Sequence, residues 1–223
     1  MTFEKLRTIS NLQWLIFFSI ILAAWILLFV MAVTTEVGSL SAVYGKDFWR
    51  NLCGVGLQEA GFLNILLMWC LMVTAMMMPT AIPAFITYED LGYSIEVQVW
   101  PLVLGFAFIW FFFSIFATVL QIGLFRLGIL DNFGASKSIS LSFGLLLFAG
   151  IYQFSHLKNS CLQKCRQPLT FFMQHFQEGP WKNGLKLGIT CLGCCWALML
   201  LGFVGGIMNL AFMGLATLIM IIE

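Results

Sequence analysis

Five long stretches without a charged residue dominate this sequence and decide what it can fold into. They comprise residues 12–33, 60–88, 97–125, 138–155 and 187–222. A bilayer core about 30 Å thick is crossed by roughly 20 apolar residues of α-helix. Each stretch is long enough to supply a membrane-spanning helix, so the sequence predicts an all-α protein that crosses a membrane several times.

The last stretch is too long for one crossing. Its 36 residues would form a helix of about 54 Å. Gly205 and Gly206 lie at its centre and favour a tight reversal of the chain. The prediction is therefore a single integral membrane domain, a polytopic helix bundle of about six spans. The expected spans are residues 12–33, 62–86, 99–121, 139–155, 187–204 and 206–222.

The composition agrees with a membrane protein and excludes other classes. Hydrophobic residues make up 61% of the 223 residues and charged residues 9%, whereas soluble domains have about 25% charged residues. A soluble protein of this size could not bury so much apolar surface. The 16% of aromatic residues excludes intrinsic disorder, and a net charge of +1 gives no indication of nucleic-acid binding.

The distribution of basic residues predicts the orientation. With six spans, both termini share one side of the membrane with Lys5, Arg7, Lys158, Lys164, Arg166, Lys182 and Lys186. The other side holds Lys46, Arg50, Arg126 and Lys137. The positive-inside rule therefore favours cytoplasmic termini in the inner (cytoplasmic) membrane. The first span exceeds the apolar core of a secretory signal, which favours an uncleaved anchor, although Val30-Met31-Ala32 leaves cleavage open.

The predicted spans contain sulfur but no Asp, Glu, Lys, Arg or His. Intramembrane ionisable residues usually mark proton or ion pathways, so a proton-coupled carrier and an acid–base enzyme are both disfavoured. Cys191, Cys194 and Cys195 fall within about 100° of one helix face, and Met199 borders them. Three thiols on one face could bind a soft ion such as cuprous copper. The alternative is that they are small packing residues.

A second sulfur group lies on one face of the span at 62–86. It consists of Met68, Met72 and Met76. Pro79 lacks an N–H, so the carbonyl of Ala75 is expected to be bare and to share that face. The hydroxyl of Thr74 or Thr80 could supply part of the missing hydrogen bonding. The methionines are either secondary soft-metal ligands or ordinary core-filling residues.

The segment between residues 156 and 186 holds a third candidate set, formed by His156, Cys161, Cys165 and His175. An apolar stripe predicts an amphipathic helix in the membrane interface, broken at Pro168, with the basic residues off the stripe. The stripe consists of Leu157, Cys161, Cys165, Leu169, Phe172 and Phe176. An ordinary basic cytoplasmic loop, with reduced thiols, is the alternative.

Three further polar or sulfur-bearing residues have simpler interpretations. Cys53 and Cys70 are isolated and are expected to be structural. Asn209 is the strongly polar side chain of the last span and is expected to bond to a neighbouring helix or to orient a ligand.

Three segments together resemble a bacterial family of unknown function, predicted to be metal-binding integral membrane proteins and sometimes labelled copper chaperones. They are Met68–Pro79, Tyr152–Leu169 and Gly188–Met213, and their most specific motif is Cys191, Cys194, Cys195 and Trp196. His156 stands where the family usually has proline, and Phe212 where it commonly has tryptophan. The resemblance implies a membrane fold and a metal-binding role.

The leading hypothesis is a non-enzymatic membrane protein that binds copper, or another soft metal, for handling, delivery or transport. Cys191, Cys194 and Cys195 would be the main ligands, and a copper-receiving protein or membrane complex the partner. One alternative is an accessory subunit of a membrane complex. A thiol oxidoreductase using Cys191 and Cys194 is disfavoured, because burial in an apolar span disfavours a reactive thiolate.

Overall fold

A computed structural model describes residues 3–36, 61–91, 99–130, 135–206 and 209–222. The described chain is almost entirely helical and contains no strand, which confirms the all-α class. The long helices are α1 (Phe3–Glu36), α3 (Phe62–Leu91), α4 (Val99–Arg126), α5 (Ile139–Gln153), α8 (Pro180–Leu200) and α10 (Leu210–Ile222). The shorter elements are α6 (His156–Arg166), α7 (Pro168–His175), the 3-10 helix η1 (Phe176–Glu178) and α9 (Gly202–Gly205).

Four of the predicted spans are helices long and apolar enough to cross a membrane. They lie within α1, α3, α4 and the continuous α8–α9 segment. Helix α5 has 15 residues and meets α6 at a bend of 62°, so this pair is a possible fifth span. Helix α10 has 13 residues, about 20 Å of helix, which is shorter than the bilayer core. The count of six spans and the cytoplasmic termini remain predictions.

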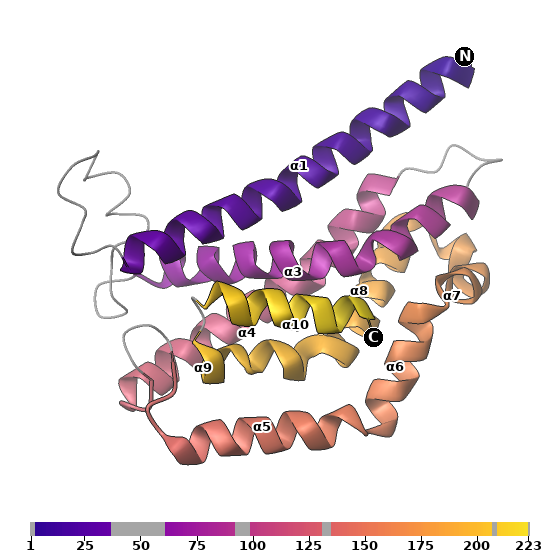
Figure 1. The fold of residues 1–223 in the computed structure, drawn as a ribbon. Helices are drawn as coiled ribbons and strands as arrows, with labels where there is room; N and C mark the ends of the chain where they lie inside the picture. The colour runs from indigo at the N-terminus through magenta and orange to yellow at the C-terminus, as the bar shows by residue number, and fades with distance from the viewer. Residues whose placement is uncertain (1–2, 37–60, 92–98, 131–134, 207–208, 223) are drawn as a thin grey trace, which may run out of the picture.

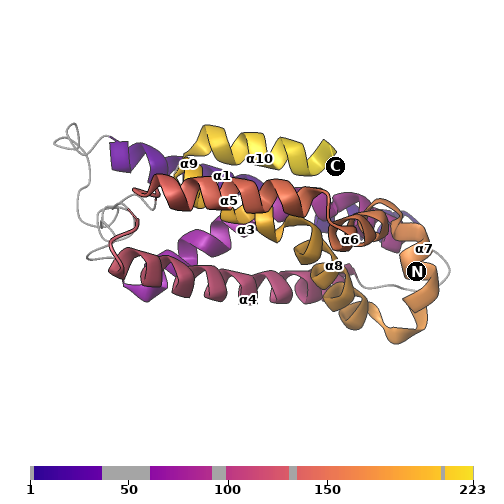
Figure 2. The ribbon, with the colours of Figure 1, turned by 90° about the horizontal axis from the view of Figure 1, so that it is seen from below.

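The long helices alternate in direction along one axis. Helix α1 begins and α10 ends at the same end of the bundle, where α6 and α7 also gather (Figures 1 and 2). The predicted reversal is present, because α9 ends at Gly205 and α10 begins at Leu210. Gly206 has a φ of 86°, a backbone conformation that favours glycine.

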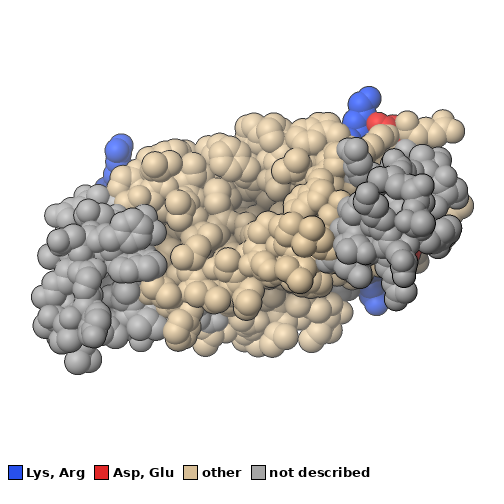
Figure 3. Space-filling view, turned by 90° about the horizontal axis from the view of Figure 1, so that it is seen from above, with Lys and Arg blue, Asp and Glu red and all other residues tan. Residues whose placement is uncertain are grey.

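The outer surface of the bundle is apolar between its two ends. Large hydrophobic side chains that are half exposed or more cover several helices, among them Leu15, Leu22, Phe29, Phe112 and Val119. Figure 3 shows the charged side chains of one face only towards the two ends of the molecule. Such a surface is compatible with a membrane protein, because lipid tails can cover it.

Helices α4 and α8 pack so closely that their contact requires glycine. A Cβ atom on Gly184 would lie 2.2 Å from the carbonyl oxygen of Leu102, and one on Gly105 would lie 2.6 Å from the carbonyl oxygen of Trp181. Small residues allow helices to approach in this way in membrane proteins. This contact fixes α8 against α4, and α6 packs on another side of α8.

The carbonyl of Ala75 is not bare, contrary to the sequence-based expectation. Trp25 of α1 donates its Nε1–H to this oxygen at 3.0 Å. The hydroxyls of Thr74 and Thr80 donate instead to the carbonyls of Cys70 and Met77. The sequence does not reveal the donor because Trp25 lies fifty residues away and only helix packing brings it to α3.

Asn209 also differs from its prediction. Its side chain is exposed, and its Oδ1 accepts a hydrogen bond from the backbone N–H of Phe212 at 3.2 Å. Asn209 therefore caps the start of α10 rather than bonding to a neighbouring helix.

Candidate metal centre

The three cysteines of α8 converge as their spacing predicts. Cys191, Cys194 and Cys195 are all buried, and their Sγ atoms lie within 4.8 Å of one another. The Sγ atoms of Cys194 and Cys195 are 3.2 Å apart, and the Cys194 thiol donates to the carbonyl of Cys191 at 3.0 Å. One helical turn therefore presents three thiols to one point.

Helix α6 brings further thiols to this cluster. The Cys165 side chain lies close enough to interact with the side chains of Cys191 and Cys194. Cys161 lies one turn earlier, and a Cβ atom on Gly193 of α8 would be 2.7 Å from its Sγ. The absence of a side chain at Gly193 therefore leaves the space that Cys161 fills. The candidate centre is built from two helices that are far apart in sequence.

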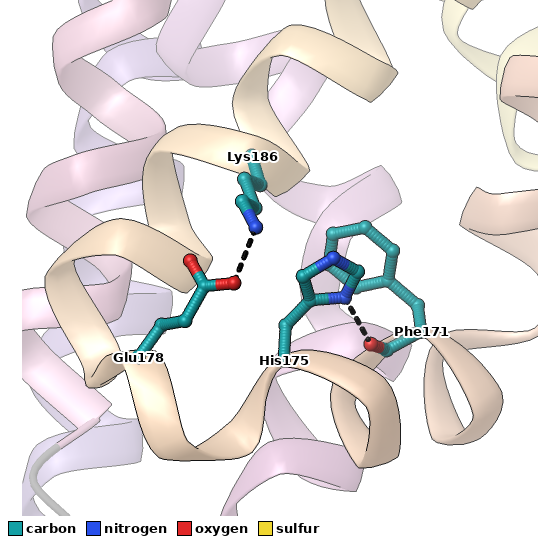
Figure 4. A network of polar contacts seen from close by, with 4 residues as sticks. All are labelled: Phe171, His175, Glu178 and Lys186. Carbon is teal, nitrogen blue, oxygen red and sulfur yellow. Dashed lines mark hydrogen bonds and ion pairs between the residues drawn. The ribbon is translucent and has the colours of Figure 1, made fainter.

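The histidines predicted to share a site with Cys161 and Cys165 lie elsewhere. His156 is exposed. His175 contacts the carbonyl of Phe171 through Nδ1 at 3.0 Å, and it lies beside the pair formed by Glu178 and Lys186 (Figure 4). Within the described chain, the groups able to hold a metal contain thiols and no histidine. Neither histidine therefore belongs to the thiol group that the described residues form, and a metal-binding role for Cys161 and Cys165 remains a prediction.

Glu178 and Lys186 form an exposed ion pair where η1 leads into α8. Lys186 Nζ lies 2.6 Å from Glu178 Oε1 (Figure 4). This hydrogen bond and the nearby charges of Lys186, His175 and Lys182 lower the pKa of the Glu178 carboxyl. The Glu178 carboxylate is therefore paired with Lys186 and does not belong to the thiol cluster.

Lys158 is a charged residue that is buried, contrary to the sequence-based expectation. The sequence pattern predicts it on the polar side of an amphipathic helix, but its side chain is only 1% exposed, whereas Leu157 of the predicted apolar stripe is 58% exposed. Its Nζ donates to Gln153 Oε1 at 2.6 Å. It also interacts electrostatically with the Cys194 side chain. The break at Pro168 is confirmed, because α6 ends at Arg166 and α7 begins at Pro168.

The spacing of Lys158 was a usable signal. Lys158, Cys161 and Cys165 are separated by three and four residues, so they share one helix face. The predicted orientation of this helix places Lys158 towards water because lysine is charged, and it does not use the fact that Lys158 shares a face with Cys161 and Cys165. Because α6 packs against α8 through this face, the lysine is carried inside with the cysteines.

Aromatic side chains cover the cluster on the α5 side. The Tyr152 hydroxyl donates to the carbonyl of Gly193. The ring of Trp196 lies 5.4 Å from that of Tyr152 and 5.5 Å from that of Phe148, measured between centroids. These rings hold α5 against the segment of α8 that carries the thiols.

The predicted methionine ligands are buried but occupy different surroundings. Met199 follows Cys195 by one turn on α8. The other three, Met68, Met72 and Met76, are buried on α3. Helix α3 packs mainly on α4 and α1, whereas α8 packs mainly on α4 and α6. Cys70 is also on α3, where its side chain interacts with that of Ser114, and Cys53 lies outside the described residues.

The chemistry of the cluster suits a soft metal ion. Two thiolates bound to one ion at about 2.3 Å are at most about 4.6 Å apart, and the three α8 thiols all lie within 4.8 Å of one another. Thiolates favour Cu(I) or Zn(II), whereas Mg²⁺ and Ca²⁺ prefer oxygen. The fold and the thiol cluster together define a helical protein, of a build compatible with membranes, that has a possible metal site.

A family model described as "Copper chaperone" (PpoB2) matches residues 66–223. The chain belongs to this family, which confirms the resemblance inferred from its motifs. The match begins within α3 and includes α6, α8 and every thiol of the cluster. Comparison with curated proteins found no match, and comparison with solved structures found none.

Proposed function

We propose that this protein is an integral protein of the inner membrane that binds Cu(I) and delivers it to another protein or membrane complex. The observation that carries this proposal is the convergence of Cys165 from α6 with Cys191, Cys194 and Cys195 from α8. The family description, copper chaperone, supports copper as the ion.

The number of thiols supports a role in delivery rather than permanent storage. Cu(I) is satisfied by two or three soft ligands, whereas the cluster holds four thiols, with Cys161 adjacent. An ion bound by some of them can therefore exchange partners without leaving sulfur. Copper is then the cargo, and the protein needs no catalytic residue of its own.

The ends of the bundle support the proposed orientation. Lys164 and Arg166 on α6 and Lys182 and Lys186 on α8 lie at the end where α1 begins. Arg126 is the last residue of α4, at the opposite end of the bundle, and Lys137 follows it in the segment before α5. The excess of basic residues at the first end favours its placement in the cytoplasm.

Metal analysis of the purified full-length protein tests the proposal. After expression with added copper, the wild type is expected to retain about one or more copper ions per chain. The variant with Cys191, Cys194 and Cys195 all replaced by serine is expected to retain none. Cys70→Ser, which removes a thiol from α3, is the matched control and should keep its copper.

Two other outcomes favour other functions. Absence of copper from the wild type, together with a fixed co-purifying partner, would favour the accessory-subunit hypothesis. A redox-sensitive thiol pair, revealed by alkylation before and after reduction, would favour a thiol oxidoreductase.

A further inference from the structure

We infer that Cys161 is the transfer thiol of the centre, the residue through which copper passes between an outside sulfur ligand and the buried thiols of α8. This inference rests on the proposed function and deepens it, because it names the side of the centre from which the ion is exchanged. The molecule that exchanges copper here must present a thiol or another soft ligand to the outer face of α6.

Helix α6 has one face towards the bundle and another towards water. Its exposed side chains are mostly polar or charged, namely His156, Asn159, Ser160, Gln163, Lys164 and Arg166. Lipid tails do not cover lysine and arginine, so this face meets the aqueous phase or the headgroup layer at the end of the bundle (Figures 1 and 2). On this side a single helix separates the thiol centre from water.

Cys161 lies at the border between these two faces. At about 100° per residue, it is about 60° around the helix from the exposed Lys164, whereas Cys165 is about 100° from that lysine. The Cys161 side chain is half-buried, whereas the three thiols of α8 are all buried. Cys161 is therefore the outermost thiol of the group.

The sulfur of Cys161 also touches the helix that carries the buried thiols. A Cβ atom on Gly193 would lie 2.7 Å from this sulfur, so Cys161 rests against the backbone of α8 at the residue directly before Cys194. The carbonyl of Gly193 accepts a hydrogen bond from Tyr152, which ties this turn of α8 to α5. Cys161 thus lies between water and the first of the buried thiols.

Passing a Cu(I) ion inwards requires only ligand exchange. As the Cys161 sulfur bonds to the ion, its thiol loses a proton, and the sulfur of the donor molecule, whose bond to copper breaks, takes one up. As a thiol of α8 then binds the ion, that thiol loses its proton and Cys161 regains one. Copper stays Cu(I) throughout, so no oxidant or reductant takes part. Release follows the same steps in reverse.

The first test needs no copper. The copper-free, full-length protein is treated with a charged, membrane-impermeant maleimide, and the modified residues are identified by peptide mass spectrometry. Cys161 is expected to react before the three thiols of α8, because it is the more accessible. Cys70 is the internal control, since it is also half-buried but lies in the apolar span of α3, and it should react slowly. Alkylation of the α8 thiols as fast as that of Cys161 would overturn the inference and leave the proposed function standing.

The second test separates the rate of transfer from the affinity. Exchange of Cu(I) between the purified full-length protein and a chromophoric Cu(I) chelator is followed anaerobically by stopped flow. Cys161→Ser is expected to slow loading and release alike, each by on the order of tenfold. The affinity should stay within about threefold of the wild type, because Cys165 and the α8 thiols remain to bind the ion. Cys70→Ser is the matched control and should change neither the rate nor the affinity.

The two kinds of failure can be told apart. A folded Cys161→Ser variant that exchanges copper at the wild-type rate would overturn the role of Cys161 alone, and Cys161→Ala takes its place if the serine variant does not fold. An affinity that falls as far as in Cys165→Ser would also overturn this role, because Cys161 would then be a permanent ligand. A wild-type protein that binds no Cu(I) would overturn the proposed function together with the inference.

Discussion

Trp25 of α1 donates its indole N–H to the carbonyl of Ala75 on α3. In a regular helix the backbone N–H of residue 79 would donate to this carbonyl, but Pro79 has no N–H. The two residues thus join the first two long helices at a point where the backbone of α3 would otherwise have an unsatisfied acceptor. A buried carbonyl without a partner is costly in an apolar environment, so this bond explains how α3 tolerates an internal proline there.

Removing the indole donor should destabilise the contact between α1 and α3. Trp25→Phe is expected to lower the free energy of unfolding by about 1–3 kcal/mol, since a buried acceptor loses its partner. In a Pro79→Ala background, where residue 79 again has an N–H, the same substitution should have a smaller effect. Unfolding in mixed micelles measures both, and equal effects in the two backgrounds would contradict the assignment.

The close approach of α4 and α8 makes a second prediction. Gly184→Ala should prevent the two helices from packing, because the new Cβ would lie 2.2 Å from the backbone oxygen of Leu102. The expected result is loss of folded protein and of bound copper. Gly214→Ala on α10 is the control, because a Cβ there meets nothing within 4 Å. Gel filtration in detergent compares the two, and a fully folded Gly184→Ala variant would refute the packing.

The two-helix construction of the thiol centre predicts a role for Cys165. Cys165→Ser should weaken Cu(I) binding by about tenfold or more, although it leaves the three cysteines of α8 unchanged, because the thiol that α6 places beside both Cys191 and Cys194 is lost. Chelator competition measures the change, with Cys70→Ser as the matched control. Wild-type affinity in Cys165→Ser would restrict the centre to α8.

The ion pair at the start of α8 predicts a small pH effect (Figure 4). Because Lys186 lowers the pKa of Glu178 below its ordinary value of 4.5 in the folded protein, the pair contributes stability above that pH and loses it as the pH falls through the lowered value. Glu178→Gln should therefore melt slightly below the wild type at pH 7, and the difference should shrink and then vanish as the pH falls below 4.5 through the lowered pKa. A difference that persists in acid would contradict this origin. The effect is small because the pair is exposed.

Much of the architecture follows from local properties of the sequence. Uncharged apolar runs locate the long helices, Gly205 and Gly206 mark the final reversal, and the spacing of Cys191, Cys194 and Cys195 places three thiols together. Each of these features depends on residues within one or two helical turns, so periodicity and backbone preferences are sufficient to predict it.

The rest of the candidate site depends on how distant helices pack. Cys165 joins the cluster, and Lys158 is buried, only because α6 bends by 62° from α5 and lies against α8. The sequence pattern predicts that Lys158 faces water and that Leu157 is buried, whereas the structure buries Lys158 and exposes Leu157. Likewise, nothing near Ala75 in the sequence indicates that Trp25 reaches it. Contacts between helices that are far apart in sequence cannot be predicted from the local sequence pattern of one chain.

X-ray absorption at the copper edge of the purified, copper-loaded protein tests the central claim most directly. The account predicts Cu(I) with two or three sulfur neighbours, and loss of this signal when Cys191, Cys194 and Cys195 are replaced by serine. A first shell of nitrogen or oxygen, or an unchanged sulfur shell in the serine variant, would contradict the assignment of copper to the thiol centre.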